Sequence, residues 1–439
     1  MKLRVKLIGG SLAVSIVLFL GAAGVRAQGT PAATPPPPGT IITLQNWQQY
    51  KQFMPDGMQA LFAGKYHWKF PPDFQMVIGP PTNYQQPKVF VDDTEKYAPQ
   101  VKIVTLPSGM HILSGYVAGL PFPNPQEPMK GWKVLVNLWY RYQPWVCCGP
   151  VTRIKLIDRF GNVTRSSTNF DYIRVGHVAA TGMPIYNPVL PDVDYCTHNM
   201  LTMPEQSKYT TNMTLYYLDA TKFEDVFIFV PALRRVLRLS PAARCSPFIG
   251  TDLTQDDNRA GWNGGYARFD GTFVRDQIIP ELINADPLVY SKMRNYYPGL
   301  LFPRPIIGKW EMRQVYVIDV RRIPQQRAGY CYGKRIMYVD KASFNGTWVD
   351  SYDSSMRLWK INWPQHIARD VPGLGMLYET LNFLYGTYDV QNAHATVAWT
   401  SDSKGHDHHG GDECKDYLGV NYADVARFCT PGGLRQVMR

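Results

Sequence analysis

Residues 225–257 read DVFIFVPALRRVLRLSPAARCSPFIGTDLTQDD, and this stretch guides the interpretation of the whole chain. It starts as a strand of large apolar side chains and ends in an acidic turn that contains glycine. Three arginines interrupt it: Arg234, Arg235 and Arg238. Charged side chains within an apolar, strand-forming run need partners or solvent, so their placement carries information about the fold.

Alternation along a strand assigns these side chains to faces. Phe227 and Phe229 fall on one face of the first strand. After Pro231 we expect a second strand, in which Arg235 lies among leucines on one face and Arg234 and Arg238 share the other. We therefore predict that Arg235 is half-buried and paired with a nearby acid, and that the other two arginines face solvent or an anionic headgroup. The candidate acids are Asp252, Asp256 and Asp257.

Residues 1–27 have the pattern of a secretory signal. Lys2, Arg4 and Lys6 precede an apolar run over residues 7–23, which is shorter than the about 20 residues that a membrane span prefers. We predict cleavage near Ala27 and a periplasmic protein that can associate with the outer membrane. Residues 28–42 form a Pro-rich tether.

The charge of the chain bears on its partners. The formal charge is +11, and it falls to +7 without the four basic residues of the first 27. This mild excess suits an anionic membrane surface or a lipid headgroup. An exported chain without a dense basic block is not expected to bind nucleic acid.

Seven cysteines in an exported chain predict disulfides, and the odd number leaves one over. Cys414 and Cys429 flank a short loop that a bridge between them would close. Cys147 and Cys148 are adjacent and are expected to reach different partners rather than each other. Their candidate partners are Cys196, Cys245 and Cys331.

Residues 101–400 show strand patterns with short connections, which is typical of an antiparallel sheet. Strands are predicted over 132–142 (WKVLVNLWYRY), 154–158, 163–168, 213–218, 226–230, 313–321, 335–339, 347–352, 356–361 and 394–400, and a helix over 373–385. Residues 43–100 are expected to form a helical or irregular lid, with short helices near 44–54 and 56–62. Residues 401–439 form a His-rich loop and a C-terminal tail.

The chain carries none of the common catalytic patterns, such as GxSxG, HExxH, a P-loop or a dinucleotide fingerprint after a strand. We therefore expect no enzymatic activity and no cofactor. His406, His408 and His409, with Asp412 and Glu413 nearby, are weak candidates for a metal site. A solvated polar loop explains them equally simply and is the favoured interpretation.

Several segments resemble, in order, the motifs of a bacterial family of unknown function that is commonly labelled as outer-membrane lipoprotein-sorting-like. They are residues 115–123 (GYVAGLPFP), 229–239 (FVPALRRVLRL) with 250–257, 335–340 (RIMYVD), 352–360 (YDSSMRLWK) and 417–434. The cysteines, the tether and the His-rich loop depart from the family pattern, so the resemblance says nothing of them.

The resemblance implies a fold like that of the lipoprotein carriers LolA and LolB. We accordingly expect a mainly β protein with short helices, in which a curved antiparallel sheet forms an open half-barrel around a helical plug. Such a cleft can hold a hydrophobic guest, with residues 44–62 as its lid. The expected ligand contacts are Trp132, Trp139, Tyr140, Phe227, Phe229, Arg234, Arg235 and Arg238.

The function that the resemblance implies is a periplasmic carrier for a lipid or another hydrophobic molecule, accessory to an export system of the resistance-nodulation-division type. Its partners would be the cargo, a membrane surface or envelope transport proteins. A structural envelope protein with a filled barrel is the alternative. A hydrolase or metal enzyme would need His406, His408 or His409 to meet acids within a cleft.

Overall fold

The computed structural model describes residues 34–240, 244–283, 285, 287–290, 292–371, 375–400 and 409–436. The predicted signal, residues 28–33 of the predicted tether, and His406 and His408 lie outside these residues. Among the helices that are described, none is long and apolar enough to cross a membrane.

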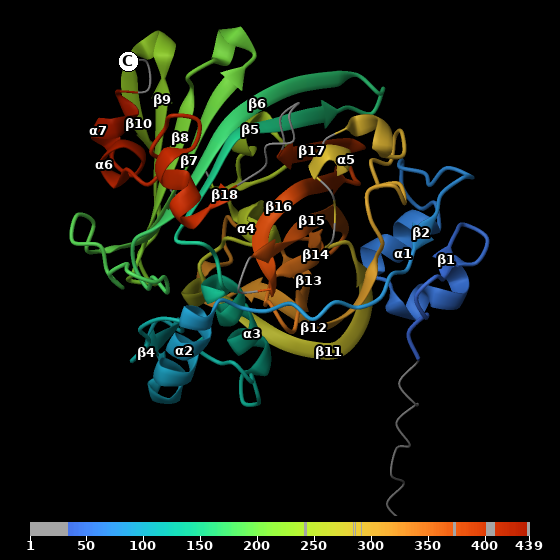
Figure 1. The fold of residues 1–439 in the computed structure, drawn as a ribbon, viewed down its shortest axis with the longest axis horizontal. Coiled ribbons are helices and arrows are strands. Elements are labelled where there is room, and N and C mark those ends of the chain that lie inside the picture. The colour runs from blue at the N-terminus through green and yellow to red at the C-terminus, as the bar shows by residue number, and fades with distance from the viewer. Residues whose placement is uncertain are drawn as a thin grey trace, which may run out of the picture. The chain divides into compact units, whose positions relative to one another are not determined.

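A single antiparallel sheet dominates the described chain (Figure 1). Its strands follow the order β10 (Arg235–Leu239), β9 (Asp225–Val230), β8 (Thr211–Tyr217), β7 (Val193–Met203), β6 (Val163–Arg174), β5 (Val146–Ile157), β17 (His394–Thr400), β16 (Gly375–Asp389), β15 (Leu358–Val371), β14 (Gly346–Tyr352), β13 (Lys334–Asp340), β12 (Glu311–Arg322) and β11 (Phe269–Glu281). The short β18 (His409–Gly410) pairs with β5. Within the described residues β10 and β11 pair on one side only, so the sheet is open. The predicted mainly β, open antiparallel fold is confirmed.

Strand alternation gives the sheet two faces that bury different segments. We call the face that carries Thr152, Thr197 and Thr396 the inner face and the opposite face, with Ile173 and Val397, the outer face. Both faces carry buried side chains, which explains why many strands read as apolar throughout.

The two ends of the chain cover the outer face. The N-terminal part contributes β1 (Ile41–Ile42), a 3-10 helix (Trp47–Phe53), α1 (Asp56–Phe62) and β2 (Met76–Val77), which pack on the half of the sheet from β11 to β17. The C-terminal part contributes α6 (Val425–Phe428) and α7 (Pro431–Leu434), which lie beside β7–β10 (Figure 1). The predicted lid at 44–62 is therefore a packed outer layer.

The described part of the chain contains three disulfides, and none of them is the expected bridge between Cys414 and Cys429. Cys148 bonds to Cys414, Cys196 to Cys429, and Cys245 to Cys331. The first two attach the C-terminal tail to β5 and β7, and Cys147 is left as a buried thiol. A bridge between Cys414 and Cys429 was wrong because each of these cysteines faces a strand, not the other side of its own loop.

Helix α3 (Lys130–Tyr140) occupies the place where a strand over 132–142 was predicted. It is buried on almost every side, so its apolar residues show no periodicity that separates helix from strand. The helix lies directly on β11. The two backbones are so close at Gly131 that a Cβ atom there would collide with the backbone of Gly271 and Phe273. Asn137 fixes it further by bonding the N–H of Phe122 at 3.0 Å and its carbonyl at 2.5 Å.

The other secondary-structure predictions are partly confirmed and partly wrong. The hairpin over 154–168 and the strands near 313–361 and 394–400 are confirmed. The helix over 373–385 is wrong, since Gly375–Asp389 pairs with strands on both sides. Residues 115–123, which carry one of the family motifs, lie between β4 and α3 and form no strand. The remaining elements are α2 (Lys88–Tyr97), the hairpin β3 (Lys102–Thr105) and β4 (His111–Ser114), α4 (Asn258–Gly261) and α5 (Pro287–Tyr290).

The contact between α1 and the sheet predicts a pH dependence of stability. The fully buried Asp350 accepts hydrogen bonds from Gly57 N at 2.8 Å and Trp348 Nε1 at 2.9 Å. Burial raises its pKa to about 7. An acid with a raised folded-state pKa stabilises the fold at low pH, and this stabilisation is lost as the pH rises from the unfolded value through about 7.

Asp350→Asn should remove this dependence. Between about pH 5 and 8 the wild type should lose roughly 2–3 kcal/mol relative to the variant, measured by urea unfolding. Asp92→Asn, at an exposed helix position, is the control and should follow the wild type. Parallel pH profiles for wild type and Asp350→Asn would contradict the assignment.

Candidate functional site

Residues 244–263, which we call the plug segment, lie on the inner face of the sheet. The disulfide Cys245–Cys331 attaches one end. Further along, Gln255 Nε2 donates to Tyr216 OH at 2.5 Å, and Asn263 bonds the hydroxyls of Tyr195 and Tyr216 at 2.5 and 2.6 Å. The segment that opened the sequence analysis thus runs from the edge strands into the plug.

Two adjacent carboxylates hold the centre of the plug segment. Asp257 is fully buried and pairs with Arg335 on β13 at 3.0 Å. Its other oxygen accepts from Tyr332 OH at 2.6 Å and from Thr254, which completes a capping box. Burial alone would raise the pKa of Asp257. The charges of Lys360 and Arg335, together with the hydrogen bonds to the carboxylate, lower it below its usual value instead.

Asp256 connects the plug segment to a second set of charges. Arg244 lies 2.8 Å from Asp256 and 2.5 Å from Glu224, and Tyr330 OH donates to Asp256 at 2.6 Å. Arg268 also lies 3.3 Å from Glu224. All four charged groups are buried, so each depends on its partners to offset the cost of leaving water.

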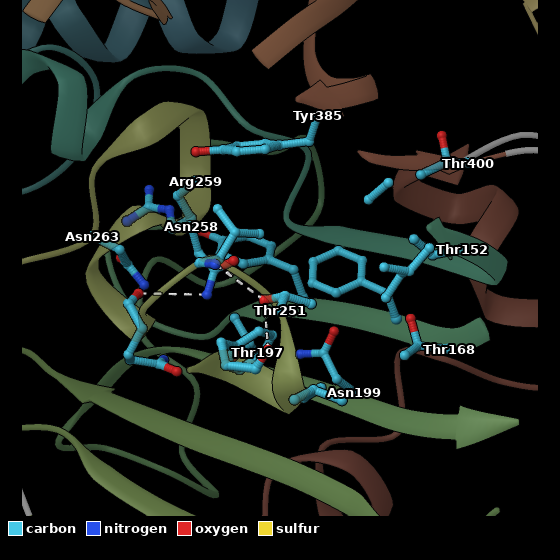
Figure 2. Close-up of a pocket in the computed structure, with 18 of the residues that line it drawn as sticks. Thr152, Thr168, Thr197, Asn199, Thr251, Asn258, Arg259, Asn263, Tyr385 and Thr400 are labelled. Carbon is cyan, nitrogen blue, oxygen red and sulfur yellow. Dashed lines mark hydrogen bonds between the residues drawn. The ribbon is translucent and has the colours of Figure 1, made fainter. Parts of the chain in front are cut away.

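A cavity of about 160 Å³, which we call the inner cavity, lies between the plug segment and the sheet (Figure 2). Its apolar wall consists of Ile154, Phe170, Phe248, Ile249, Leu253 and Ala398. Strands β5, β6, β7 and β17 add the hydroxyls of Thr152, Thr168, Thr197, Thr396 and Thr400. Figure 2 shows Arg259 and Asn263 towards one end, and Thr152, Thr168 and Thr400 towards the other.

A second cavity of about 440 Å³, the edge cavity, lies next to it towards β8–β10. Its wall includes Leu201, Val226, Ile228 and Leu239. Phe248, Ile249 and Gln255 line both cavities, so one short stretch of the plug segment stands between them. Ile249 there adopts a left-handed conformation with φ of 49°, which is unfavourable for a β-branched residue.

The three arginines that were expected to bind ligand or acids do not pair with the acids of the plug segment. Arg235 is exposed and does not pair with Asp252, Asp256 or Asp257, so that prediction was wrong. Asp252 and Asp257 bind residues far away in sequence, and Asp256 binds Arg244 of its own segment; strand alternation reveals none of these partners. Arg234 and Arg238 are exposed as expected, and Arg238 lies 2.5 Å from Asp225.

The predicted aromatic contacts lie away from both cavities. Trp132, Trp139 and Tyr140 belong to α3 and pack in the core beneath it. Phe227 and Phe229 share a face as predicted, but that face packs against the C-terminal tail. Val226 and Ile228, from the opposite face, line the edge cavity. The roles of the predicted residues in ligand binding stay predictions.

His409 is the single member of the predicted histidine cluster that falls within the described residues. Its Nδ1 lies 2.7 Å from Glu413 Oε2. No group of three or more metal-ligating side chains occurs in the part of the chain that the structure describes.

Sequence reasoning missed the two arginines of the inner cavity, Arg141 and Arg259. Arg141 lies within a segment that was predicted as a strand, and Arg259 follows the acidic turn, so no pattern brought them together. The threonines that share one strand face, Thr164 and Thr168 in β6 and Thr396 and Thr400 in β17, were a usable signal, since hydroxyls on one strand face indicate a surface that is not a dry core.

Residues 41–425 match the family described as "Protein of unknown function (DUF1329)", and the chain belongs to this family. The resemblance noted in the sequence is thereby confirmed. The chain is 24% identical over 409 residues to the uncharacterized protein PA3922 of Pseudomonas aeruginosa, covering 90% of this chain and 80% of that protein.

Two solved structures are also similar. One is a DUF1329 family protein from Desulfovibrio piger, with 13% identity, a TM-score of 0.45, and coverage of 67% of this chain and 100% of that one. The other is the LolA superfamily protein NE2245 from Nitrosomonas europaea, with 15% identity, a TM-score of 0.34, and coverage of 60% and 86%.

The buried pairs predict unequal effects of removing charges. Asp257→Ala should lower the free energy of unfolding by about 3–5 kcal/mol, because it leaves Arg335 buried without its carboxylate. Arg238→Ala, which removes an exposed partner of Asp225, should leave the free energy unchanged within error. Urea denaturation of both variants measures the difference, and equal effects would show that the plug segment does not depend on Asp257.

Proposed function

We propose that this chain is an envelope binding protein, not an enzyme, and that it carries a lipid or another hydrophobic molecule in the cavities of its inner face. The observation that carries the proposal is the pair of adjoining cavities between the plug segment and the sheet. Their walls include apolar side chains from both layers beside a smaller set of polar groups, as in most sites for small hydrophobic ligands.

The free energy of burying apolar groups favours an acyl chain or another elongated apolar molecule as the ligand. Each methylene group that leaves water contributes about 0.8 kcal/mol, so a chain that fills the inner cavity alone could bind usefully. The threonine hydroxyls of the sheet also add hydrogen-bonding positions along the ligand.

The compartment and partners are part of the same proposal. The pattern of residues 1–27 supports export to the periplasm, and the family likeness supports a place near the outer membrane. An accessory role beside an export system of the resistance-nodulation-division type extends this by resemblance. Cross-linking in the periplasm followed by identification of the attached transporter tests that extension.

A structural envelope protein with a filled sheet is the second candidate. One observation favours it: α3 and the buried charges around Asp256 and Asp257 fill the inner face between β11 and β14. The two candidates differ in whether the remaining cavities accept a ligand.

The carrier predicts binding of a neutral apolar fluorophore, N-phenyl-1-naphthylamine, and a bound lipid in native mass spectrometry of the exported protein. Ala398→Trp, which places an indole in the inner cavity, should weaken fluorophore binding at least about tenfold, since it displaces apolar contact of the order of 1.4 kcal/mol or more. Ala426→Trp, at an exposed position of α6, is the matched control and should bind like the wild type. Absence of both fluorophore and lipid from the wild type would favour the filled structural protein.

A further inference from the structure

The inner cavity has a cationic end. Arg141, which is only 2% exposed, and the half-buried Arg259 both line it. Arg141 Nε donates to Asn345 Oδ1 at 2.5 Å and its Nη1 to Leu138 O at 2.7 Å. Arg259 donates to Gln143 Oε1 and to Trp139 O, both at 2.9 Å from Nη2. All of these acceptors are uncharged.

Most of the deeply buried arginines in the described part of the chain have carboxylate partners, as Arg174 has Asp194 at 3.2 Å and Arg335 has Asp257 at 3.0 Å. Arg322, which is 5% exposed, shares with Arg141 the lack of an ion pair among the described residues, but it lines neither cavity. Among the described residues, no carboxylate lies within ion-pair distance of Arg141 or Arg259. A buried cation is costly unless an anion offsets it.

A structural role explains these arginines in part. Leu138 O and Trp139 O belong to the last turn of α3, and cations favour a helix C-terminus. Arg259 also lies over the rings of Tyr195 and Trp139, with its central carbon 4.4 and 5.0 Å from their centroids. Yet a helix end carries only about half a negative charge, and two full positive charges face it.

One donor is left over. Nη2 of Arg141 is buried and has no hydrogen-bond acceptor among the described residues. Burial and the neighbouring charge of Arg259 lower the pKa of Arg141 to about 9, a value at which it is still a cation at neutral pH. The site therefore holds a fixed positive charge and an unused donor beside an apolar cavity.

The geometry points to an anionic single-chain amphiphile as the ligand of the inner cavity, with its carboxylate or phosphate bound by Arg141 and Arg259 and its chain along Ile154, Phe170 and Leu253. This inference rests on the proposed carrier function and names the class of its cargo. An arginine pair suits both headgroups because guanidinium N–H groups match the oxygens of carboxylate and phosphate.

Competition against N-phenyl-1-naphthylamine tests the inference with the full exported chain. The competitors are dodecanoate, dodecyl phosphate and dodecanol, which share one chain length, and inorganic phosphate alone. We expect at least one of the two anions to compete about tenfold or more better than dodecanol, since hydrogen bonds to charged groups are the stronger ones. The better anion identifies the headgroup, and inorganic phosphate should not compete.

Variants assign the preference to the arginines. Arg259→Gln and Arg141→Gln should each reduce the advantage of the anion over dodecanol about tenfold while dodecanol itself still binds, which shows that the cavity is intact. Arg259→Lys, which keeps the charge, should retain part of the advantage. Arg165→Gln, at an exposed position of β6, is the control and should change nothing.

The outcomes are distinct. If dodecanol competes as well as both anions in the wild type, the anionic cargo is wrong although the carrier function stands. The assignment of the headgroup site is wrong if the preference for the anion persists in Arg141→Gln and Arg259→Gln. It is also wrong if inorganic phosphate, which has no alkyl chain, displaces the fluorophore. If the fluorophore and all three amphiphiles fail to bind, the carrier function itself fails. If a glutamine variant does not fold, the wild-type comparison and Arg259→Lys still decide.

Discussion

The pairing of Asp256 and Asp257 with two buried arginines, Arg244 of the plug segment and Arg335 of β13, is the constraint on which the inner face depends. Asp257 reaches Arg335 on β13, and Asp256 reaches Arg244, which also binds Glu224 before β9. Each carboxylate would be prohibitively costly to bury alone. Because Arg335 lies on β13 and Glu224 directly precedes β9, these pairs tie the plug segment to two distant parts of the sheet, and the inner and edge cavities are lined by this segment and the strands.

The outer face is stabilised by a different kind of link. Two disulfides join the C-terminal tail to β5 and β7, over sequence separations of 266 and 233 residues. The N-terminal part packs an aromatic layer, with Phe62, Phe70 and Phe74 in mutual ring contact. The two cavities for which ligand binding is proposed lie on the opposite, inner face, where the plug segment meets the sheet.

The sequence patterns predicted some elements correctly and others wrongly, and each outcome has a physical reason. Residues 226–230 were assigned to the right faces, because a strand has a strict period of two. Residues 132–142 were assigned to a strand and form α3, because a segment buried on all sides loses its periodicity. The acidic turn was recognised as a partner for arginines, but Arg235 was chosen for its position among leucines on one strand face, whereas Arg244 of the plug segment and Arg335 of β13 are the partners in space.

By itself the sequence determined that the chain is mainly β, with an antiparallel sheet of short connections and an apolar interior, since these follow from local periodicity and turn residues. It also carried the family motifs. The tertiary structure alone decided which acids meet which arginines, which cysteines bond, and that Arg141 and Arg259 converge on one cavity. Those contacts join residues that are far apart in sequence, and no local pattern encodes which pairs the folding of the sheet will bring together.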